Sequence, residues 1–217
     1  METGHHNGLP AASRAFLFLL ASSRPDGNTE QLARAAAAAL PPEAGRRWIS
    51  LRDLPLEPFR DVRHDDDPHY PLPQGSERIL LDATLQATDL VVASPLYWYS
   101  VSAHAKLYLD HWSRWLRVPD VDFRARMHGR TLWAVTAYSS GDPAHVEPLL
   151  GTLRLCADYL GMHWGGELLA AANRPGDVAA DPVTLARAAR FFSDLPGGAP
   201  FPRRLDRAPP GRRPSVL

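Results

Sequence analysis

The sequence predicts a three-layer α/β fold in which a five-stranded parallel sheet carries helices on both faces. Between residues 15 and 195, short apolar runs alternate with longer segments of helical periodicity, which is the pattern of repeated βα units. Residues 89–94 contain four consecutive apolar positions, 90–93, as expected of a strand that is buried on both faces. Proline and glycine separate the runs and mark where the elements end. We therefore expect one domain over residues 15–195.

The first βα unit starts with the apolar strand 15–21. The helix after it begins near Asn28, a plausible cap, and ends before Pro41. Its apolar face is formed by Leu32, Ala35, Ala36, Ala39 and Leu40. Residues 46–51 make the second strand.

Residues 52–75 are rich in proline and acidic side chains, and they predict an irregular flap over one edge of the domain. Residues 76–87 then read as a helix, residues 89–94 as the third strand and residues 103–116 as a helix. The apolar positions in line on that last helix are Ala105, Leu109, Trp112 and Leu116.

Residues 130–137 form the fourth apolar strand, and Gly161 marks the end of the helix that follows. The stripe of this helix consists of Val146, Leu149, Leu150, Leu153, Ala157 and Leu160. Residues 163–171 are the fifth strand. A last helix has Asp181 as its cap and Pro182 at its first position. It presents inward Leu185, Ala188, Ala189 and Phe192.

Composition narrows the partners and the compartment. Lys+Arg and Asp+Glu number 24 each, so no basic surface favours nucleic acid. Cys156 is the only cysteine, which excludes an intrachain disulfide framework or a cysteine-ligated metal site and favours a reducing, cytoplasmic setting. The longest early apolar run is far shorter than the roughly 20 residues that a membrane helix requires, so no membrane partner is expected.

Both ends of the chain are expected to be flexible tails. Residues 1–14 lack the pattern of a signal peptide, and residues 196–217 are dominated by proline, glycine and arginine. The alternative for the second tail is an arm that docks on a neighbouring subunit or an acidic partner.

Three unusual loops follow strands one, three and four: residues 22–29, 95–102 and 138–142. Ligands of open parallel sheets bind beyond the carboxyl ends of the strands, so these loops share the ligand-binding edge. The first loop leads into a helix N-terminus, which favours a phosphate. The groups that can bind its oxygens are the hydroxyls of Ser22, Ser23 and Thr29, the amide of Asn28 and the guanidinium of Arg24. The alternative is an ordinary capped turn.

Competing phosphate motifs are absent. Neither G-x-x-x-x-G-K-[ST] nor G-x-G-x-x-G occurs, which argues against a nucleoside triphosphatase or a Rossmann dehydrogenase. In the second loop, Tyr97, Trp98 and Tyr99 follow Pro95 where a strand leaves the core, which indicates a flat ligand. The alternative is packing beneath the next helix. Together the two loops favour a planar, phosphorylated cofactor.

The stretches Ser-Ser-Arg-Pro-Asp-Gly-Asn-Thr at 22–29 and Ser-Pro-Leu-Tyr-Trp-Tyr-Ser-Val-Ser-Ala-His-Ala-Lys-Leu-Tyr-Leu-Asp at 94–110 are similar to signatures of a known family. The chain resembles the flavodoxin-like NAD(P)H-dependent FMN reductases and NAD(P)H:quinone oxidoreductases over roughly residues 15–192. The resemblance implies a flavodoxin-like fold, bound FMN, NADPH or NADH as electron donor, a small-molecule acceptor and a homodimer.

The resemblance also implies residue roles. The FMN phosphate would be held by Ser22, Arg24, Asn28 and Thr29, beside Ser23. The isoalloxazine ring would be bordered by Pro95, Leu96, Tyr97 and Trp98. Its other side would be closed by Tyr138, Ser139, Ser140 and Gly141. Lys106 and Asp110 would have a structural or subunit-contact role, and no catalytic side chain or metal ligand is implied.

Several departures from the family leave the acceptor open. Paired cysteines are absent after residue 51, which excludes an iron-sulfur flavoprotein. His111 follows Asp110 where relatives often have arginine, and the composition of the flap has no close match. Quinones, free flavins, azo dyes, nitroaromatics and metal ions all remain candidate acceptors.

Other functions have weaker support. A non-enzymatic electron carrier like flavodoxin would share fold and cofactor, but carriers resemble acidic docking surfaces and this chain is neutral. A hydrolase would use Ser139 or Ser140 with His145 or His104 and Asp142, yet no G-x-S-x-G elbow is present. The run His-Asp-Asp-Asp-Pro-His at 64–69 could bind a divalent metal, and a solvated acidic loop explains it equally.

Overall fold

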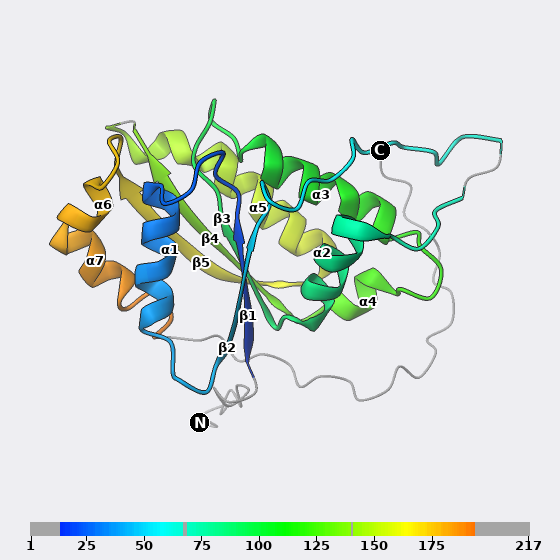
Figure 1. Ribbon diagram of the computed structural model, residues 1–217, viewed down its shortest axis with the longest axis horizontal. Helices are drawn as coiled ribbons and strands as arrows, with labels where there is room; N and C mark the ends of the chain where they lie inside the picture. The colour runs from blue at the N-terminus through cyan, green and yellow to red at the C-terminus, as the bar shows by residue number, and fades with distance from the viewer. Residues whose placement is uncertain (1–13, 67–68, 140, 194–217) are drawn as a thin grey trace, which may run out of the picture.

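The computed structural model describes residues 14–66, 69–139 and 141–193, and Figure 1 shows one sheet between two helical layers. The strands are β1 (Ala15–Leu20), β2 (Gly45–Ser50), β3 (Asp89–Ala93), β4 (Thr131–Tyr138) and β5 (His163–Ala171). All of them pair in parallel, in the order β2-β1-β3-β4-β5. This order is that of the flavodoxin-like sheet, which confirms the predicted fold class.

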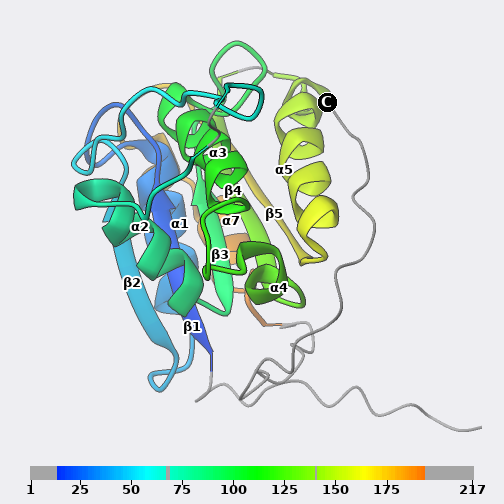
Figure 2. The same cartoon turned by 90° about the vertical axis from the view of Figure 1, so that its right-hand side faces the viewer.

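The helices divide between the two faces (Figures 1 and 2). One face carries α1 (Asn28–Ala38), α6 (Asp177–Ala180) and α7 (Pro182–Ala188). The other carries α2 (Gly75–Gln86), α3 (Ala103–Trp115), α4 (Phe123–Met127) and α5 (Glu147–Leu160). A 3-10 helix, η2 (Pro143–Val146), precedes α5. None of the described helices is long and apolar enough to cross a membrane.

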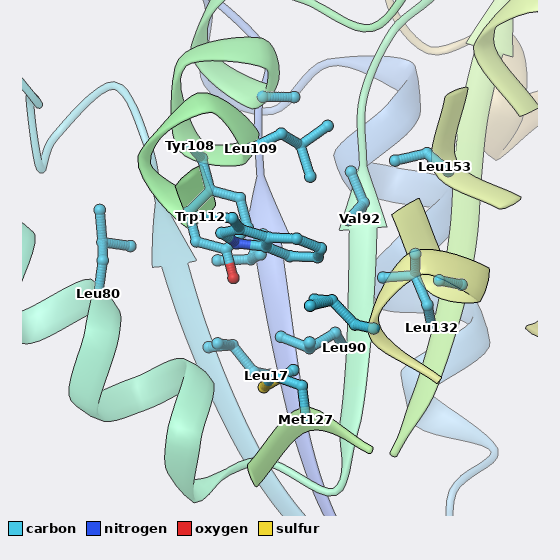
Figure 3. Close-up of a cluster of buried hydrophobic side chains, with 14 of the residues drawn as sticks. Leu17, Leu80, Leu90, Val92, Tyr108, Leu109, Trp112, Met127, Leu132 and Leu153 are labelled. Atoms are coloured by element: carbon cyan, nitrogen blue, oxygen red, sulfur yellow. The ribbon is translucent and has the colours of Figure 1, made fainter. Parts of the chain in front are cut away.

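Each face of the sheet has its own apolar core because successive strand residues point to opposite sides. In β1, Phe16 and Phe18 pack toward α1 and α7, whereas Leu17 and Leu19 pack toward the four helices of the other face. Figure 3 shows Leu17 in this second core, which also contains Tyr108 and Trp112 of α3. Full burial of one such apolar side chain contributes about 2 kcal/mol to folding.

A buried ion pair fixes the end of the sheet that lies opposite the three predicted ligand loops. Arg14 donates to both carboxylate oxygens of Asp89, and both side chains are almost completely buried. The same carboxylate accepts hydrogen bonds from Thr88 Oγ1, at 2.6 Å, and from Trp133 Nε1, at 2.9 Å. Arg14 therefore belongs to the folded part, although the sequence placed it in the tail; the rest of both predicted tails lies outside the described residues.

Some predicted inward positions are wrong at the helix ends. Ala39 and Ala189 are exposed because each is the residue just after the last helical residue, where the helical period no longer applies. Asn28 is also not the cap of α1, because Gly27 occupies that position. Between β2 and α2 the described residues form no helix or strand, as predicted for the flap.

Candidate functional site

The loops after β1, β3 and β4 meet at one edge of the sheet, as parallel strands require (Figure 1). Ser102, the N-cap of α3, ties two of them together. Its Oγ donates to the carbonyl of Ala21, at 2.6 Å, and its backbone N–H donates to Ser94 Oγ, at 2.9 Å. The aromatic loop is thereby fixed at its base against the end of β1.

The loop before α1 gathers polar groups beside Gly27, which we call the polar space around Gly27. A Cβ built on Gly27 would lie 3.6 Å from both Ser22 Oγ and Arg24 Nε, so these two side chains face the glycine. The first N–H groups of α1 have no partner within the helix and carry the positive end of its dipole. A hydroxyl, a guanidinium and free N–H groups around one glycine fit a phosphate monoester.

One acidic side chain beside this loop has its charge compensated. Glu30 accepts a hydrogen bond from the backbone N–H of Asp26, at 3.1 Å, and pairs with Arg34 at 2.6 Å. The carboxylate therefore stabilises the turn before α1 in the manner of a capping-box glutamate. Its ion pair with Arg34 lowers the repulsion that it would exert on an anion at the loop.

Two predicted phosphate ligands, Asn28 and Thr29, are buried and make contacts within the protein. Asn28 Nδ2 donates to the carbonyl of Arg174, at 2.8 Å, and Asn28 Oδ1 accepts from the N–H of Val178, at 3.4 Å. Thr29 Oγ1 accepts from the N–H of Ala137, at 3.4 Å. These side chains fasten the first turn of α1 to β4 and to the loop after β5.

The second loop is a tight hairpin with an aromatic tip. Tyr97 and Ser100 exchange both backbone hydrogen bonds, each 3.1 Å long. The residues between them, Trp98 and Tyr99, have φ values of 49° and 63°, as a type I′ turn requires. Such turns favour asparagine and glycine, and left-handed backbone costs other residues about 1–2 kcal/mol. Strain of this kind gathers at functional sites.

The hairpin presents its rings to solvent and contacts the neighbouring loops. Trp98 is 93% exposed, while Pro95 is buried and Leu96 half-buried beneath it. The hydroxyl of Tyr97 lies 3.4 Å from Ser23 Oγ of the first loop. The hairpin therefore contacts the loop that leads into α1.

The third loop supports the other side of the hairpin. Tyr138 is buried, Ser139 and Gly141 are exposed, and Ser140 lies outside the described residues. The ring of His145, in the 3-10 helix after this loop, lies edge-on to Tyr99 with centroids 5.5 Å apart. Among the predicted ligand residues that the structure describes, Asn28 and Thr29 are the ones whose buried side chains bind other parts of the fold. The side chains of Ser22, Ser23 and Tyr97 make contacts of 3.4 Å within or between the loops of the site.

A polar cluster anchors α3 to α2. Glu77 Oε1 accepts a hydrogen bond from Trp115 Nε1, at 2.9 Å. The same oxygen lies 3.1 Å from His111 Nδ1 and 3.0 Å from Arg114 Nε. One largely buried carboxylate thus contacts both the imidazole of His111 and the guanidinium of Arg114.

The cluster also holds the flap. His111 Nε2 lies 2.9 Å from the carbonyl oxygen of Glu57, and Arg114 donates to the carbonyl of Pro71, at 2.9 Å. Burial alone would lower the pKa of His111, but the Glu77 carboxylate and the Glu57 carbonyl raise it above the ordinary value. Burial would likewise raise the pKa of Glu77, and its contacts with His111 and Trp115 lower it instead.

The remaining predicted features are peripheral. Lys106 and Asp110 form an ion pair of 2.6 Å with each other on the outer side of α3. Residues 64–66 are exposed, and part of the acidic run after them lies outside the described residues. Among the residues that the structure describes, no group of three or more histidine, cysteine or acidic side chains could hold a metal ion.

Sequence reasoning did not single out Arg174, which follows β5. The residue types that indicated a ligand were confined to the loops after strands one, three and four. Asn-Arg-Pro-Gly-Asp at 173–177 would have been the signal, because it is a polar turn that leaves the sheet at the same edge.

Comparisons with known proteins show the family and the fold. The model of the family described as NADPH-dependent FMN reductase matches residues 15–175. The Bacillus subtilis protein YwqN, named for an NAD(P)H-dependent FMN-containing oxidoreductase, is 30% identical over 171 residues, covering 78% of this chain and 92% of that protein. A Bacillus subtilis structure described as a Trp repressor binding protein has a TM-score of 0.65 and 25% identity, covering 82% of this chain and 97% of that one. The apo NADH:FMN oxidoreductase EMOB has a TM-score of 0.59 and 22% identity, covering 82% of this chain and 87% of that one.

Proposed function

The chain belongs to the NADPH-dependent FMN reductase family, and from this premise we propose that it passes electrons from NAD(P)H through FMN to a small oxidised acceptor. One observation carries the proposal: the polar space around Gly27 and the aromatic hairpin lie at the same sheet edge. Ser102 joins their bases and Ser23 approaches Tyr97. A phosphate cradle beside exposed rings suits a planar cofactor with a phosphate.

The proposed roles follow from this arrangement. Ser22 and Arg24 bind the phosphate together with the first N–H groups of α1, and Asn28 and Thr29 keep that turn in place. Pro95, Leu96 and the hairpin form one wall for the ring, and Tyr138, Ser139 and Gly141 form the other. Bound FMN supplies the hydride- and electron-transfer chemistry.

The proposed kinetic scheme is ping-pong. The tip of the hairpin is open to solvent, so the nicotinamide and the acceptor can occupy the same face in turn. The protein then contributes stacking, orientation and exclusion of water from one face, and no side chain has to act as a general base. Quinones and free flavins are the proposed acceptors because both are planar and can stack against the exposed rings.

The proposal is tested by absorption spectroscopy of the purified full-length protein with added FMN. We expect the visible bands of flavin after unbound FMN is removed, and bleaching of these bands when NADPH or NADH is added without oxygen. Restoration of the bands by a quinone would support turnover. A protein that retains no FMN would contradict the proposal.

The second candidate, a non-enzymatic electron carrier, has the same fold and cofactor. It is favoured only by the exposed aromatic tip, which a redox partner could contact. The same spectra separate the two: a carrier would retain FMN but would not be bleached by NADPH or NADH. We also propose a cytoplasmic homodimer, which size-exclusion chromatography with light scattering tests.

A further inference from the structure

The loop between β5 and α6 lies beside the start of α1 in space, although it is far away in sequence (Figure 1). Asn28, the first residue of α1, binds the carbonyl of Arg174 and the N–H of Val178 through its side-chain amide. The loop is also fixed from within, because Asp177 Oδ2 accepts the N–H groups of Asn173, at 2.9 Å, and Arg174, at 2.7 Å. The backbone of Arg174 is thus held against the helix N-terminus.

Among the described residues, the guanidinium of Arg174 makes no hydrogen bond or ion pair, and its charge acts at longer range on Asp177, whose pKa it helps to lower. Within residues 14–66, 69–139 and 141–193, the guanidinium of Arg24 likewise makes neither an ion pair nor a hydrogen bond. By contrast, Arg34 and Arg187 near the same helices are engaged, the first with Glu30 and the second with the carbonyl of Leu169. Two guanidinium groups without a hydrogen-bonded partner among the described residues therefore belong to the two loops that adjoin the first turn of α1.

The balance of charge around a bound phosphate indicates a role for the guanidinium groups of Arg24 and Arg174. A phosphate monoester carries between one and two negative charges at neutral pH, and Asp26 is a further negative charge in the loop. Asp177 directs one carboxylate oxygen to backbone N–H groups of its own loop, and these two hydrogen bonds lower its pKa more than the charge of Arg174 does. Arg24 alone leaves the loop close to neutral or negative once the phosphate is bound, and a second guanidinium restores the balance.

Resting on the proposed function, we propose that Arg174 is a second cation for the FMN phosphate and that Asn28 is a positioning residue. Asn28 holds the backbone of Arg174 so that its long side chain reaches over the helix N-terminus. The phosphate is then bound from both sides of α1, by Arg24 from the loop before the helix and by Arg174 from the loop after β5.

The test compares FMN with riboflavin, which has the same ring and no phosphate. The cofactor-free full-length protein is titrated with each flavin while the quenching of flavin fluorescence is followed. We expect Arg174→Ala to weaken FMN binding about 10- to 100-fold, the range for one charge-assisted hydrogen bond, and to leave riboflavin binding unchanged. Arg174→Lys recovers part of the loss because it keeps the charge.

A matched control removes the same charge elsewhere. Arg190 is exposed and lies two positions before Phe192 in the sequence. The ring centroids of Phe192 and Phe16 are 5.2 Å apart, and Phe16 is at the start of β1. Arg190 is therefore near the end of the sheet opposite the proposed phosphate site. Arg190→Ala should change neither affinity. In addition, the slope of FMN affinity against salt concentration should be smaller for Arg174→Ala than for wild type.

Asn28→Ala tests the positioning role. It should lower FMN affinity selectively, like Arg174→Ala, and add little when combined with it, because both act through one side chain. Equal loss of FMN and riboflavin in Arg174→Ala, or no loss, would overturn the role of Arg174 while the proposed function stands. Wild-type protein that binds FMN no better than riboflavin would overturn both, because the cradle would then not bind phosphate.

Discussion

Ser102, the N-cap of α3, donates a hydrogen bond of 2.6 Å to the carbonyl of Ala21, which follows β1 and precedes the phosphate loop. The hydroxyl oxygen of Ser102 also accepts a hydrogen bond from the N–H of Ala105 and so caps the helix. One buried hydroxyl therefore determines both where α3 begins and how the aromatic loop lies relative to the polar cradle. The proposed ring site and phosphate site share this support.

Replacement of this hydroxyl should affect stability and binding together. Ser102→Ala loses a helix cap and leaves a buried carbonyl without a donor, so we expect the free energy of unfolding to fall by about 1–3 kcal/mol. FMN affinity should fall with it because the two loops are no longer held together. Urea unfolding and fluorescence titration measure these changes.

The matched control is Ser100→Ala in the hairpin. Among the described residues the hydroxyl of Ser100 makes no hydrogen bond, and the residue pairs with Tyr97 only through its backbone. Ser100→Ala should therefore leave the free energy of unfolding and the FMN affinity at wild-type values. An equal effect of both substitutions would show that the Ser102–Ala21 bond has no special role.

Replacement of Trp98 should change stability and activity in opposite directions. Because it is 93% exposed and has a left-handed backbone, Trp98→Asn loses little packing and relieves strain. We expect the free energy of unfolding to rise by about 1 kcal/mol. The rate with a quinone acceptor should fall because a ring of the proposed site is lost.

Thermal or urea unfolding and steady-state NADPH oxidation check this pair of effects. Leu155→Gln, at an exposed apolar position of α5, serves as control and should leave turnover unchanged. Unchanged turnover in Trp98→Asn would mean that the strained tip has another purpose than acceptor binding.

The sheet and its ligand-binding edge could be predicted because buried parallel strands have continuous apolar runs and because proline and glycine end the helices. The short elements α4, η2 and α6 could not, since four or five residues are too few to show a helical period. The hydrogen bond between Asn28 and Arg174 also could not be predicted from the sequence. Asn28 and Arg174 are 146 positions apart, and only the order of the strands brings them together.

The aromatic loop illustrates the same limit within one motif. Its residue types predicted a flat ligand, but they did not indicate that Trp98 and Tyr99 would have positive φ, because aromatic residues are uncommon in type I′ turns. The hydrogen bonds that close the hairpin, and the support from Ser102, override the local preference.

Gly165 in β5 should tolerate no side chain. A Cβ there would lie 2.3 Å from the indole ring of Trp133, which is buried against Phe191 and Phe192 and cannot move away. Gly165→Ala should lower the free energy of unfolding by about 2–3 kcal/mol. In Gly151→Ala nothing lies within 4 Å of the new methyl group, and the helix α5 gains about 1 kcal/mol. Urea unfolding should give these opposite signs; two losses of equal size would contradict the packing argument.

The cluster that holds the flap should make stability depend on pH. The pKa of His111 is raised above its ordinary 6.5, so the folded protein holds this proton more tightly than the unfolded chain does. This contribution is complete below pH 6.5 and is lost as pH rises through the folded-state pKa. The pKa of Glu77 is lowered below 4.5, so its contribution is present above pH 4.5 and is lost as pH falls through the folded-state pKa.

The cluster should therefore stabilise the fold most between pH 4.5 and 6.5. His111→Gln should remove the loss of stability above pH 6.5, because glutamine has no proton to release. Urea unfolding of both proteins from pH 4 to about 9 measures the difference. His163→Gln, at an exposed position of β5, should keep the wild-type pH dependence. If His111→Gln shows the same decline as wild type above pH 6.5, another group causes it, and His111 does not link the flap to pH.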